Sequence, residues 1–276
     1  MTKERIQKII ANSGYCSRRA AEDLIKNGLV KVNGKVINIG ATGEKTDKIT
    51  VEGNLIKPKK KFTYVVLNKP RGYVSAVTDD FEKPVQDLLS EEIKNEKVYP
   101  CGRLDKDAQG LLIFTNNGDI ANKIMHPSFN LSKTYLVKTY SPVKKEIIDF
   151  VNKYGISIKD GYVEAKIRSF GPKTMHVTIH IGYHKVVKKI FDKFGIRVQA
   201  LTRLQVGNIK IGNIKKGEFR LFTKNEINYI ENLNKKLTPK KINRKELFDK
   251  ERLSEKEFKK LSIIKKQRKQ ETKKKS

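Results

Sequence analysis

The chain opens with apolar residues at helical spacing. Isoleucines recur on one face of a helix over residues 4–13, basic side chains occupy other faces, and Gly14 ends the segment. Ser17 suits the N-cap of a second helix over residues 18–27, because its hydroxyl can accept a hydrogen bond from a free backbone N–H, and Gly28 terminates that helix. The pattern predicts two short consecutive helices.

A β-hairpin is predicted after these helices. Asn33 and Gly34 stand at the centre of residues 29–37, and this dipeptide favours the tight turn that joins two antiparallel strands. The run 57–61 combines a proline with lysines and has no apolar periodicity, so it predicts a linker. We therefore expect a small first domain over residues 1–60.

The middle of the chain changes to strand patterns. Residues 62–67 and 111–114 are apolar runs short enough for buried strands, and residues 73–77 and 135–139 predict further strands. Residues 176–182 alternate between polar and apolar positions, which places every second side chain on one face of a sheet. We predict a mixed or antiparallel β-sheet.

Helices are expected on the flanks of this sheet. Asp119 suits the N-cap of a helix that ends near residues 126–127, and residues 183–194 carry an apolar stripe. The predicted fold class is therefore α+β, with a helix-helix-hairpin domain followed by a mixed or antiparallel sheet domain with flanking helices over residues 61–232.

Residues 233–276 form a basic tail with few apolar positions. Within residues 241–276, 15 Lys or Arg stand against 6 Asp or Glu. Such a composition predicts a largely disordered or conditionally helical arm that adds salt-sensitive affinity for a polyanion, or that only improves solubility. We expect no core against which a helix in the tail could pack. The apolar residues that could line a transient helix there are Phe248, Leu253, Phe258 and Leu261.

Net charge points to the class of partner. The chain holds 60 Lys or Arg against 30 Asp or Glu, a formal charge of +30. This excess repels itself in the folded state and is best explained by a polyanionic partner, for which nucleic acid is the leading candidate. No apolar stretch approaches the ~20 residues needed to span a bilayer, and no signal-like region follows the polar start. We expect a cytoplasmic protein without a membrane partner.

Cysteine and histidine residues do not predict a metal site. Cys16 and Cys101 lie far apart in sequence and give neither a disulfide framework nor a metal-type spacing. His176 and His180 fall on one face of the alternating strand, but the sequence offers no third ligand. We expect no bound metal and no cofactor.

A charged, glycine-bounded stretch leads into one of the buried strands. It carries Arg103, Asp105 and Asp107, and Gly110 closes it before the apolar run 111–114. A carboxylate on a short loop at the mouth of a buried strand can be reactive and rigidly held at once. Two neighbouring carboxylates could also hold a metal ion in a nuclease, although further acidic ligands are not clustered with them.

This stretch resembles a known catalytic motif. Residues 102–105, 110–112 and 115–118 are similar to the catalytic motif of pseudouridine synthases that act on ribosomal RNA, and the turn Asn68-Lys-Pro-Arg-Gly72 is also typical of that family. The resemblance implies the pseudouridine synthase fold and identifies Asp105 as the catalytic aspartate. It extends over residues 3 to about 232 and implies a last helix that begins at Thr223.

The first domain resembles the S4 RNA-binding module. Residues 17–20 open the second helix, and residues 30–34 follow it in the order typical of that module. Arg18 and Arg19 lie in the first turn of the helix, where guanidinium groups can bind phosphates in a bidentate manner. We expect these two arginines to bind RNA.

The resemblance implies two further catalytic residues. Tyr135 corresponds to the active-site tyrosine of the family, whose ring can stack on a base that is turned out of the RNA. Lys188 corresponds to a basic residue that pairs with the catalytic aspartate and favours its ionised form. The remaining residues that we expect to bind RNA are Lys69, Arg71, Arg103, Lys133 and Lys185.

Three positions depart from the family pattern. Ala108 stands where the family usually has a hydroxyl residue, Ile181 where it has an acidic residue, and Val186 where it has glutamine. Their loss removes hydrogen-bonding groups around the site. Two hypotheses follow, namely an active synthase or a non-catalytic ribosome-assembly factor that uses the scaffold to bind RNA.

The expected reaction is the isomerisation of uridine to pseudouridine in ribosomal RNA. The helix over 119–128 and the motif 102–105 look closer to the large-subunit type B enzymes than to the small-subunit enzymes. Asp105 could attack the sugar, attack the base or remove a sugar proton. The expected partner is ribosomal RNA, either free or in an assembly intermediate, and the protein is expected to be a monomer.

Overall fold

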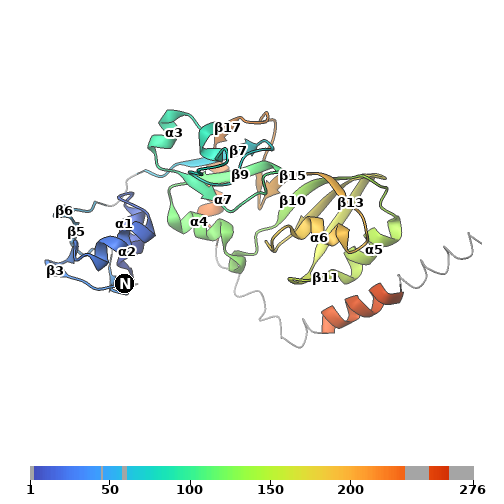
Figure 1. Cartoon of the computed structure of the whole chain (residues 1–276), viewed down its shortest axis with the longest axis horizontal. Helices are drawn as coiled ribbons and strands as arrows, with labels where there is room; N and C mark the ends of the chain where they lie inside the picture. The colour runs from blue at the N-terminus through green and yellow to red at the C-terminus, as the bar shows by residue number, and fades with distance from the viewer. Residues whose placement is uncertain (1–2, 45, 58–60, 234–248, 261–276) are drawn as a thin grey trace, which may run out of the picture.

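The computed structural model describes residues 3–44, 46–57, 61–233 and 249–260 of the 276-residue chain. A small N-terminal unit, drawn in blue, lies beside a larger body built on a long sheet (Figure 1). No helix in these ranges is long and apolar enough to cross a membrane.

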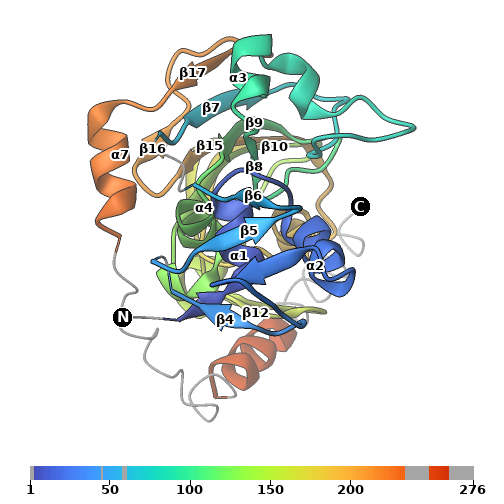
Figure 2. The same cartoon turned by 90° about the vertical axis from the view of Figure 1, so that its left-hand side faces the viewer.

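In the N-terminal unit, two helices pack on a small sheet. Figure 2 views the molecule with this unit toward the reader. Its sheet has the order β3-β2-β5-β6, and β1 pairs with β4. The buried faces of both helices contact the strands through a separate core that includes Ile6, Ile10 and Ile25. The elements are β1 (Glu4–Arg5), α1 (Ile6–Asn12), α2 (Arg18–Lys26), β2 (Val30–Val32), β3 (Lys35–Val36), β4 (Thr42–Gly43), β5 (Ile49–Val51) and β6 (Asn54–Leu55).

The local predictions for this unit are confirmed in most details. The Ser17 side chain accepts a hydrogen bond from the Ala20 N–H and caps α2. Asn33 and Gly34 both have positive φ in the turn between β2 and β3. The first helix begins later than predicted, because Glu4 pairs with β4 as part of a short strand.

The larger body contains a nine-stranded sheet. Along its main path the order is β13-β14-β10-β15-β9-β7-β17, with β16 paired to β15 and β8 paired to β9. The pairs are antiparallel except β9 with β15, which are parallel. The strands are β7 (Tyr64–Lys69), β8 (Tyr99–Cys101), β9 (Gln109–Thr115), β10 (Lys133–Thr139), β13 (Ala165–Gly171), β14 (Thr174–Ile179), β15 (Val198–Val206), β16 (Ile209–Lys210) and β17 (Phe219–Leu221).

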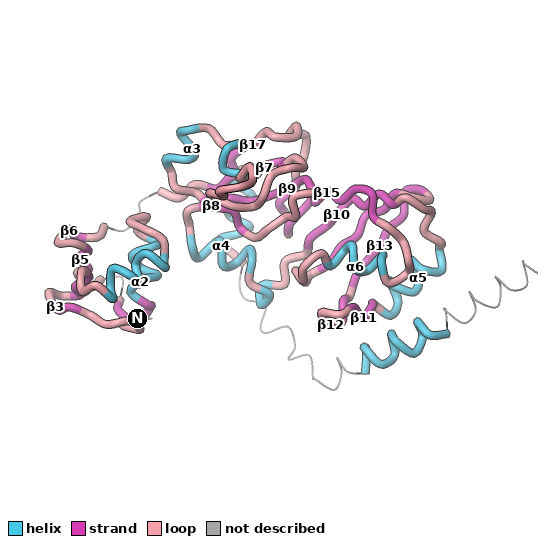
Figure 3. Tube along the Cα trace, in the orientation of Figure 1, coloured by secondary structure: helices cyan, strands magenta, loops and turns pink. Residues whose placement is uncertain are grey.

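Helices and a two-stranded ribbon flank this sheet, so the predicted α+β class is confirmed. Figure 3 shows α5 and α6 beside the strands at one end and α4 near β8 and β9. Strands β7 and β9 contain continuous apolar runs because both faces of the sheet are buried there. Val65, for example, belongs to the core on one face and Val66 to the core on the other. The elements are η1 (Val85–Leu88), α3 (Glu91–Asn95), α4 (Gly118–Met125), η2 (Pro127–Phe129), α5 (Lys145–Tyr154), β11 (Ile156–Ile158), β12 (Gly161–Val163), α6 (Val186–Asp192) and α7 (Lys224–Glu231).

Several boundaries in the larger body differ from the predictions. Residues 73–77 form no strand, and only Val74 makes an isolated bridge. Asn117, rather than Asp119, caps α4 with its side chain. The helix predicted from residue 183 begins at Val186, because the preceding residue has a left-handed backbone.

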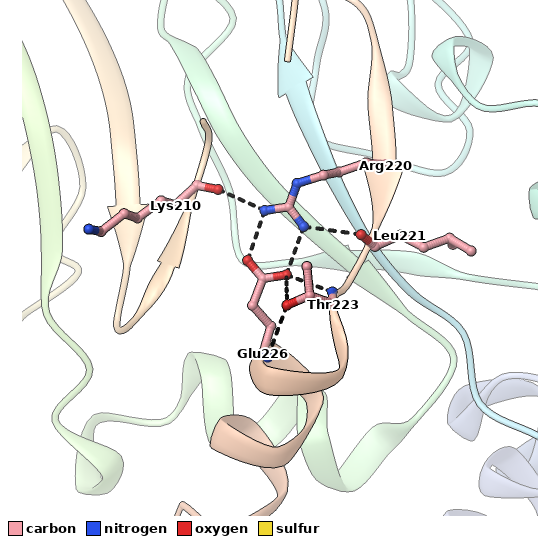
Figure 4. Close-up of polar contacts among 5 residues, drawn as sticks. All are labelled: Lys210, Arg220, Leu221, Thr223 and Glu226. Carbon is pink, nitrogen blue, oxygen red and sulfur yellow. Dashed lines mark hydrogen bonds and ion pairs between the residues drawn. The ribbon is translucent and has the colours of Figure 1, made fainter. Parts of the chain in front are cut away.

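A charged cluster fixes the last helix to the sheet (Figure 4). The Arg220 guanidinium donates two hydrogen bonds to the Glu226 carboxylate, at 2.7 and 2.8 Å, and a third to the Lys210 carbonyl at 2.9 Å. Thr223 and Glu226 also form a capping box at the start of α7, as the predicted helix start requires. The Arg220–Glu226 pair therefore joins β16, β17 and α7.

Residues 249–260 of the tail are helical and contact the larger body. The Phe258 ring lies 6.2 Å from Phe150 and 5.5 Å from Phe194, measured between ring centroids, and Ser254 is buried. The expectation that the tail has no core to pack against is therefore wrong for Phe258. Phe248 and Leu261 lie outside the described residues.

Candidate active site

The turn that carries Asp105 joins β8 to β9 and is held by hydrogen bonds to its backbone. The Ser75 hydroxyl accepts from the Leu104 N–H at 3.0 Å and donates to the Leu104 carbonyl at 2.9 Å. The Ala108 N–H donates to the Asp105 carbonyl at 3.0 Å. These bonds fix the residues on both sides of the carboxylate. Ser75 was not predicted, because it lies about 30 residues away in sequence.

A buried lysine fixes the same turn from below. Lys69 is fully buried, and its Nζ donates to the carbonyls of Pro70, Asp105 and Ala108 at 2.8 to 3.1 Å. Burial lowers the pKa of Lys69 to about 8, although the nearby Asp105 and Asp107 oppose the shift. The prediction that Lys69 binds RNA is wrong, because its ammonium group is enclosed by the protein.

Lys188 of α6 is shared between two carboxylates. Its Nζ lies 2.5 Å from Asp107 Oδ2 and 4.0 Å from Asp105 Oδ2. The hydrogen bond from Lys188 lowers the pKa of Asp107, partly against the effect of burial. The expected proximity of Lys188 to Asp105 is present, whereas its closer partner Asp107 was not expected.

Asp105 and Tyr135 line one cavity of about 550 Å³. Tyr135 reaches it from β10 and is 7% exposed as a residue, while the Asp105 side chain is 27% exposed. Apolar side chains such as Val187 and Leu201 complete its wall. The cavity falls in the size range of small-molecule sites and is large enough for a pyrimidine base.

Basic residues from separate strands and loops meet at this cavity. Arg103, Lys133 and Lys185 all line it, as does Arg203 of β15. Burial lowers the pKa of Lys133 to about 8, and Arg203 adds to the shift. The cavity therefore combines one accessible carboxylate with cations that can attract phosphate groups.

Arg203 is a site residue that the sequence did not reveal. It is buried, its Nε donates to the Leu111 carbonyl at 2.7 Å, and its Nη1 donates to the Arg103 carbonyl at 3.4 Å. Gly110 lies opposite Arg203 in the parallel pair, and a Cβ at Gly110 would meet the Arg203 carbonyl oxygen at 2.3 Å. Glycine thus allows β9 and β15 to approach closely next to the turn that carries Asp105.

Three predicted RNA-binding arginines lie away from this cavity. Arg18 and Arg19 are exposed on α2 in the N-terminal unit. Arg71 is exposed within the predicted turn Asn68–Gly72, and its guanidinium donates to the Gln199 carbonyl at 3.1 Å. Their exposure leaves all three accessible to a large polyanion.

The three departures from the family pattern are accommodated by apolar packing. Ala108 and Val186 are buried in the core, and Ile181 lines the cavity. The Ala108 carbonyl still accepts a hydrogen bond from Lys69. The turn that carries Asp105 is therefore held without a hydroxyl group at position 108.

Residues that could bind a metal are not gathered in the described part of the chain. No group of three or more His, Cys, Asp or Glu side chains there has the arrangement of a metal site. His176 contacts the Phe170 ring, whereas the ring Nδ1 of His180 lies 2.9 Å from the Asn130 carbonyl.

Models of known families match most of the chain. The model described as RNA pseudouridylate synthase matches residues 63–274, and the S4 domain model matches residues 4–42. A crystal structure of a pseudouridylate synthase is 28% identical and has a TM-score of 0.61, with the similarity covering 82% of this chain and 99% of that chain.

Curated relatives are similar over nearly their full length. Ribosomal large subunit pseudouridine synthase B of Bacillus subtilis is 37% identical over 81% of this chain and 94% of its own length. Dual-specificity RNA pseudouridine synthase RluF of Escherichia coli is 33% identical over 86% of this chain and 82% of its own length. This chain is therefore a member of the RNA pseudouridylate synthase family with an N-terminal S4 domain.

Proposed function

We propose that this protein isomerises a specific uridine of large-subunit ribosomal RNA to pseudouridine, with Asp105 as the catalytic residue. The observation that carries the proposal is the position of Asp105, whose carboxylate is on a rigid turn at a cavity that also contains the Tyr135 ring. Names of curated relatives support the substrate class, since one acts on the ribosomal large subunit.

The reaction breaks the bond between ribose C1′ and N1 of the base and forms a bond between C1′ and C5, while C5 loses its proton and N1 gains one. Substrate and product have the same composition, so the balance requires neither a redox cofactor nor ATP. A nucleophilic carboxylate can divide such a rearrangement into two easier steps. Asp105 is the accessible carboxylate among the residues that line the cavity.

Three groups assist Asp105 in this proposal. The Tyr135 ring offers a flat surface for the flipped uracil, and its hydroxyl can take part in proton transfer. Lys188 supplies positive charge beside the carboxylates. Flipping the nucleotide costs a few kcal/mol, and phosphate contacts with Arg103, Lys133 and Lys185 at the cavity would offset this cost.

We place the remaining parts of the chain in the same scheme. Residues 1–60 bind RNA through Arg18 and Arg19, residues 61–232 carry the reaction, and residues 233–276 add basic charge. The exposed Arg71 is a further candidate for a phosphate contact. The protein is expected to act in the cytoplasm as a monomer, on free ribosomal RNA or an assembly intermediate.

The decisive experiment measures pseudouridine in unmodified ribosomal RNA after incubation with purified protein. Asp105→Asn keeps the shape of the side chain and should lower the rate by at least about 10³-fold while RNA affinity persists. Asp107→Asn removes a carboxylate from the same turn and is the matched control. It should lower the rate by less than about 10-fold, because Asp107 does not line the cavity.

Two other functions predict different results. A non-catalytic assembly factor is suggested by Ala108, Ile181 and Val186, and it would bind the RNA but yield no pseudouridine with either subunit's RNA. A nuclease using Asp105 and Asp107 would shorten the RNA and lose activity when a chelator is added. Product in small-subunit RNA alone would assign the protein to that substrate instead.

A further inference from the structure

Four strands at one end of the sheet share a face that is open in the described part of the chain. Alternate residues of β13, β14, β10 and β15 are exposed or half-buried, whereas the residues between them are mostly buried. The pairing places Arg168, His176, Leu136 and Thr202 in one row across this face. In the next row, the hydroxyls of Thr134 and Thr178 lie 2.9 Å apart. We call this surface the open face.

The open face lies on the other side of the sheet from the candidate active site. Tyr135 and Val177 alternate with the open-face residues and point into the opposite side, where Tyr135 lines the cavity. Figure 1 shows α5 and α6 together on one side of these strands. A ligand on the open face would therefore not occupy the cavity that contains Asp105.

Exposed aromatic rings and arginines lie at one end of these four strands. The Arg168 guanidinium lies 5.2 Å from the centroid of the Phe170 ring, which is 4.4 Å from the His176 ring and 54% exposed as a residue. At the same end of the strands, Arg197 lies 5.5 Å from the centroid of the Tyr140 ring, and Tyr140 is 57% exposed. Each arginine orients an aromatic ring that remains accessible to solvent.

The charge of this region has one sign. Strands β10, β13, β14 and β15 contain no Asp or Glu. Lys138, Lys166 and Arg168 are exposed on the strands, and Lys173 is exposed in the connection between β13 and β14. The acidic side chain Glu164 precedes β13 at the other end and pairs with Lys250 at 2.8 Å. The end that holds the aromatic rings is therefore basic.

We propose that the open face is a second RNA-binding site that takes an unpaired segment of RNA outside the active site. Bases of that segment would stack on Phe170 and Tyr140, and Arg168, Lys138 and Lys173 would contact its phosphates. Exposed rings within a basic surface suit unpaired nucleotides, because their base faces are free for stacking. A duplex keeps its bases stacked internally and would use only the cations.

The test compares the full-length protein with the double variant Arg168→Ala/Phe170→Ala. Affinity is measured by fluorescence anisotropy with a single-stranded RNA of about 12 nucleotides and with a duplex of the same length. The variant should bind the single strand about 5-fold or more weakly, while duplex binding falls by less than about 3-fold. The matched control Leu221→Ala/Lys224→Ala removes an exposed apolar side chain and a cation at another edge of the sheet, and should bind both RNAs like the unmodified protein.

A second measurement does not depend on any variant. Crosslinking of the unmodified protein to the same single strand containing 4-thiouridine should yield an RNA-linked peptide that contains Phe170 or Tyr140. A short stem-loop substrate that reaches only the active-site cavity should be isomerised at the same rate by the double variant and by the unmodified protein. An equal rate would show that the open face is not needed for the reaction itself. Equal binding by the double variant and its control, equal weakening for strand and duplex, or crosslinks confined to other surfaces would overturn the proposal.

Discussion

At the scale of single residues, the candidate site includes groups that are enclosed by the protein. Lys69 is buried, and its ammonium group joins three carbonyls around the turn that holds Asp105. A flexible turn would allow the carboxylate to move away from a productive position. Lys69 therefore positions the turn rather than taking part in the chemistry.

Replacement of Lys69 by methionine tests this role. Lys69→Met leaves three carbonyls without their donor and should lower the free energy of unfolding by about 2 kcal/mol or more. The rate of isomerisation should fall as well, because the turn that holds Asp105 loses its support. The folded pKa of Lys69 is lowered to about 8 from 10.5, so between these pH values the unfolded state binds more protons and stability rises with pH. Denaturant unfolding should therefore give a larger advantage of the unmodified protein over Lys69→Met at pH 9.5 than at pH 7. An equal advantage at both would refute the assignment.

Gly110 supplies a second prediction at this scale. A methyl group at this position would overlap the Arg203 carbonyl oxygen at 2.3 Å, and Gly110 also has φ +107. We expect Gly110→Ala to lower the free energy of unfolding by about 3 kcal/mol or more. Gly171→Ala is the matched control, since the added Cβ meets nothing within 4 Å. Thermal unfolding should give a lower midpoint for Gly110→Ala than for Gly171→Ala. Similar midpoints for the two variants would contradict the argument.

The sequence identifies some residues of the site and not others, for a physical reason. Asp105 was found because it lies in a local motif, and the structure places it with Tyr135 at one cavity. Ser75 and Arg203 lie far away in the chain and reach the turn only after the sheet has formed. Lys69 was predicted to bind RNA, because a lysine in a turn motif gives no sign of its burial.

At the scale of elements, local sequence patterns predicted the approximate starts of several helices. Ser17 caps α2 as predicted and the last helix follows Thr223, whereas Asn117 caps α4 in place of the predicted Asp119. Predictions failed where tertiary contacts decide the outcome. Residues 73–77 have strand propensity, but they form no strand, and the Ser75 side-chain hydroxyl bonds the Leu104 backbone in the turn. The packing of the helix over 249–260 on the larger body was not predicted, because Phe258 contacts aromatic residues that lie about 60 and 110 positions earlier in the sequence.

The Glu226 cluster gives an element-scale prediction. Burial opposes ionisation of Glu226, but hydrogen bonds from Arg220 and Thr223 outweigh it and lower the pKa of the carboxyl group. Its contribution is therefore complete above the ordinary pKa of 4.5 and is lost as pH falls through the lower folded value. Glu226→Gln should lower the free energy of unfolding by about 1 to 2 kcal/mol at pH 7. Denaturant unfolding should give a smaller difference at pH 4, and a constant difference would contradict the ionic role.

At the scale of the whole molecule, the N-terminal unit contacts the larger body through charged residues. Lys8 of α1 pairs with Asp119 of α4 at 2.8 Å, and Lys97 donates to the Gly14 carbonyl at 3.2 Å. Gly118 at the start of α4 leaves room for Asn12, because a Cβ there would meet the Asn12 side chain at 2.4 Å. Basic surfaces of both units can thus engage one extended polyanion.

Salt dependence tests whether the N-terminal unit contributes to that engagement. Each phosphate neutralised by a cation contributes about 0.7 to 0.9 to the slope of log affinity against log salt concentration. If Arg18 and Arg19 each contact a phosphate, Arg18→Ala/Arg19→Ala should reduce the slope by about 1.4 to 1.8 and weaken binding equally for RNAs of different sequence. The control Lys215→Ala/Lys216→Ala removes the same charge from an exposed loop between β16 and β17 and should leave the slope nearly unchanged. Because both variants lower the net charge by two, equal slopes would mean that overall charge, rather than a phosphate site on α2, sets the salt dependence of RNA binding.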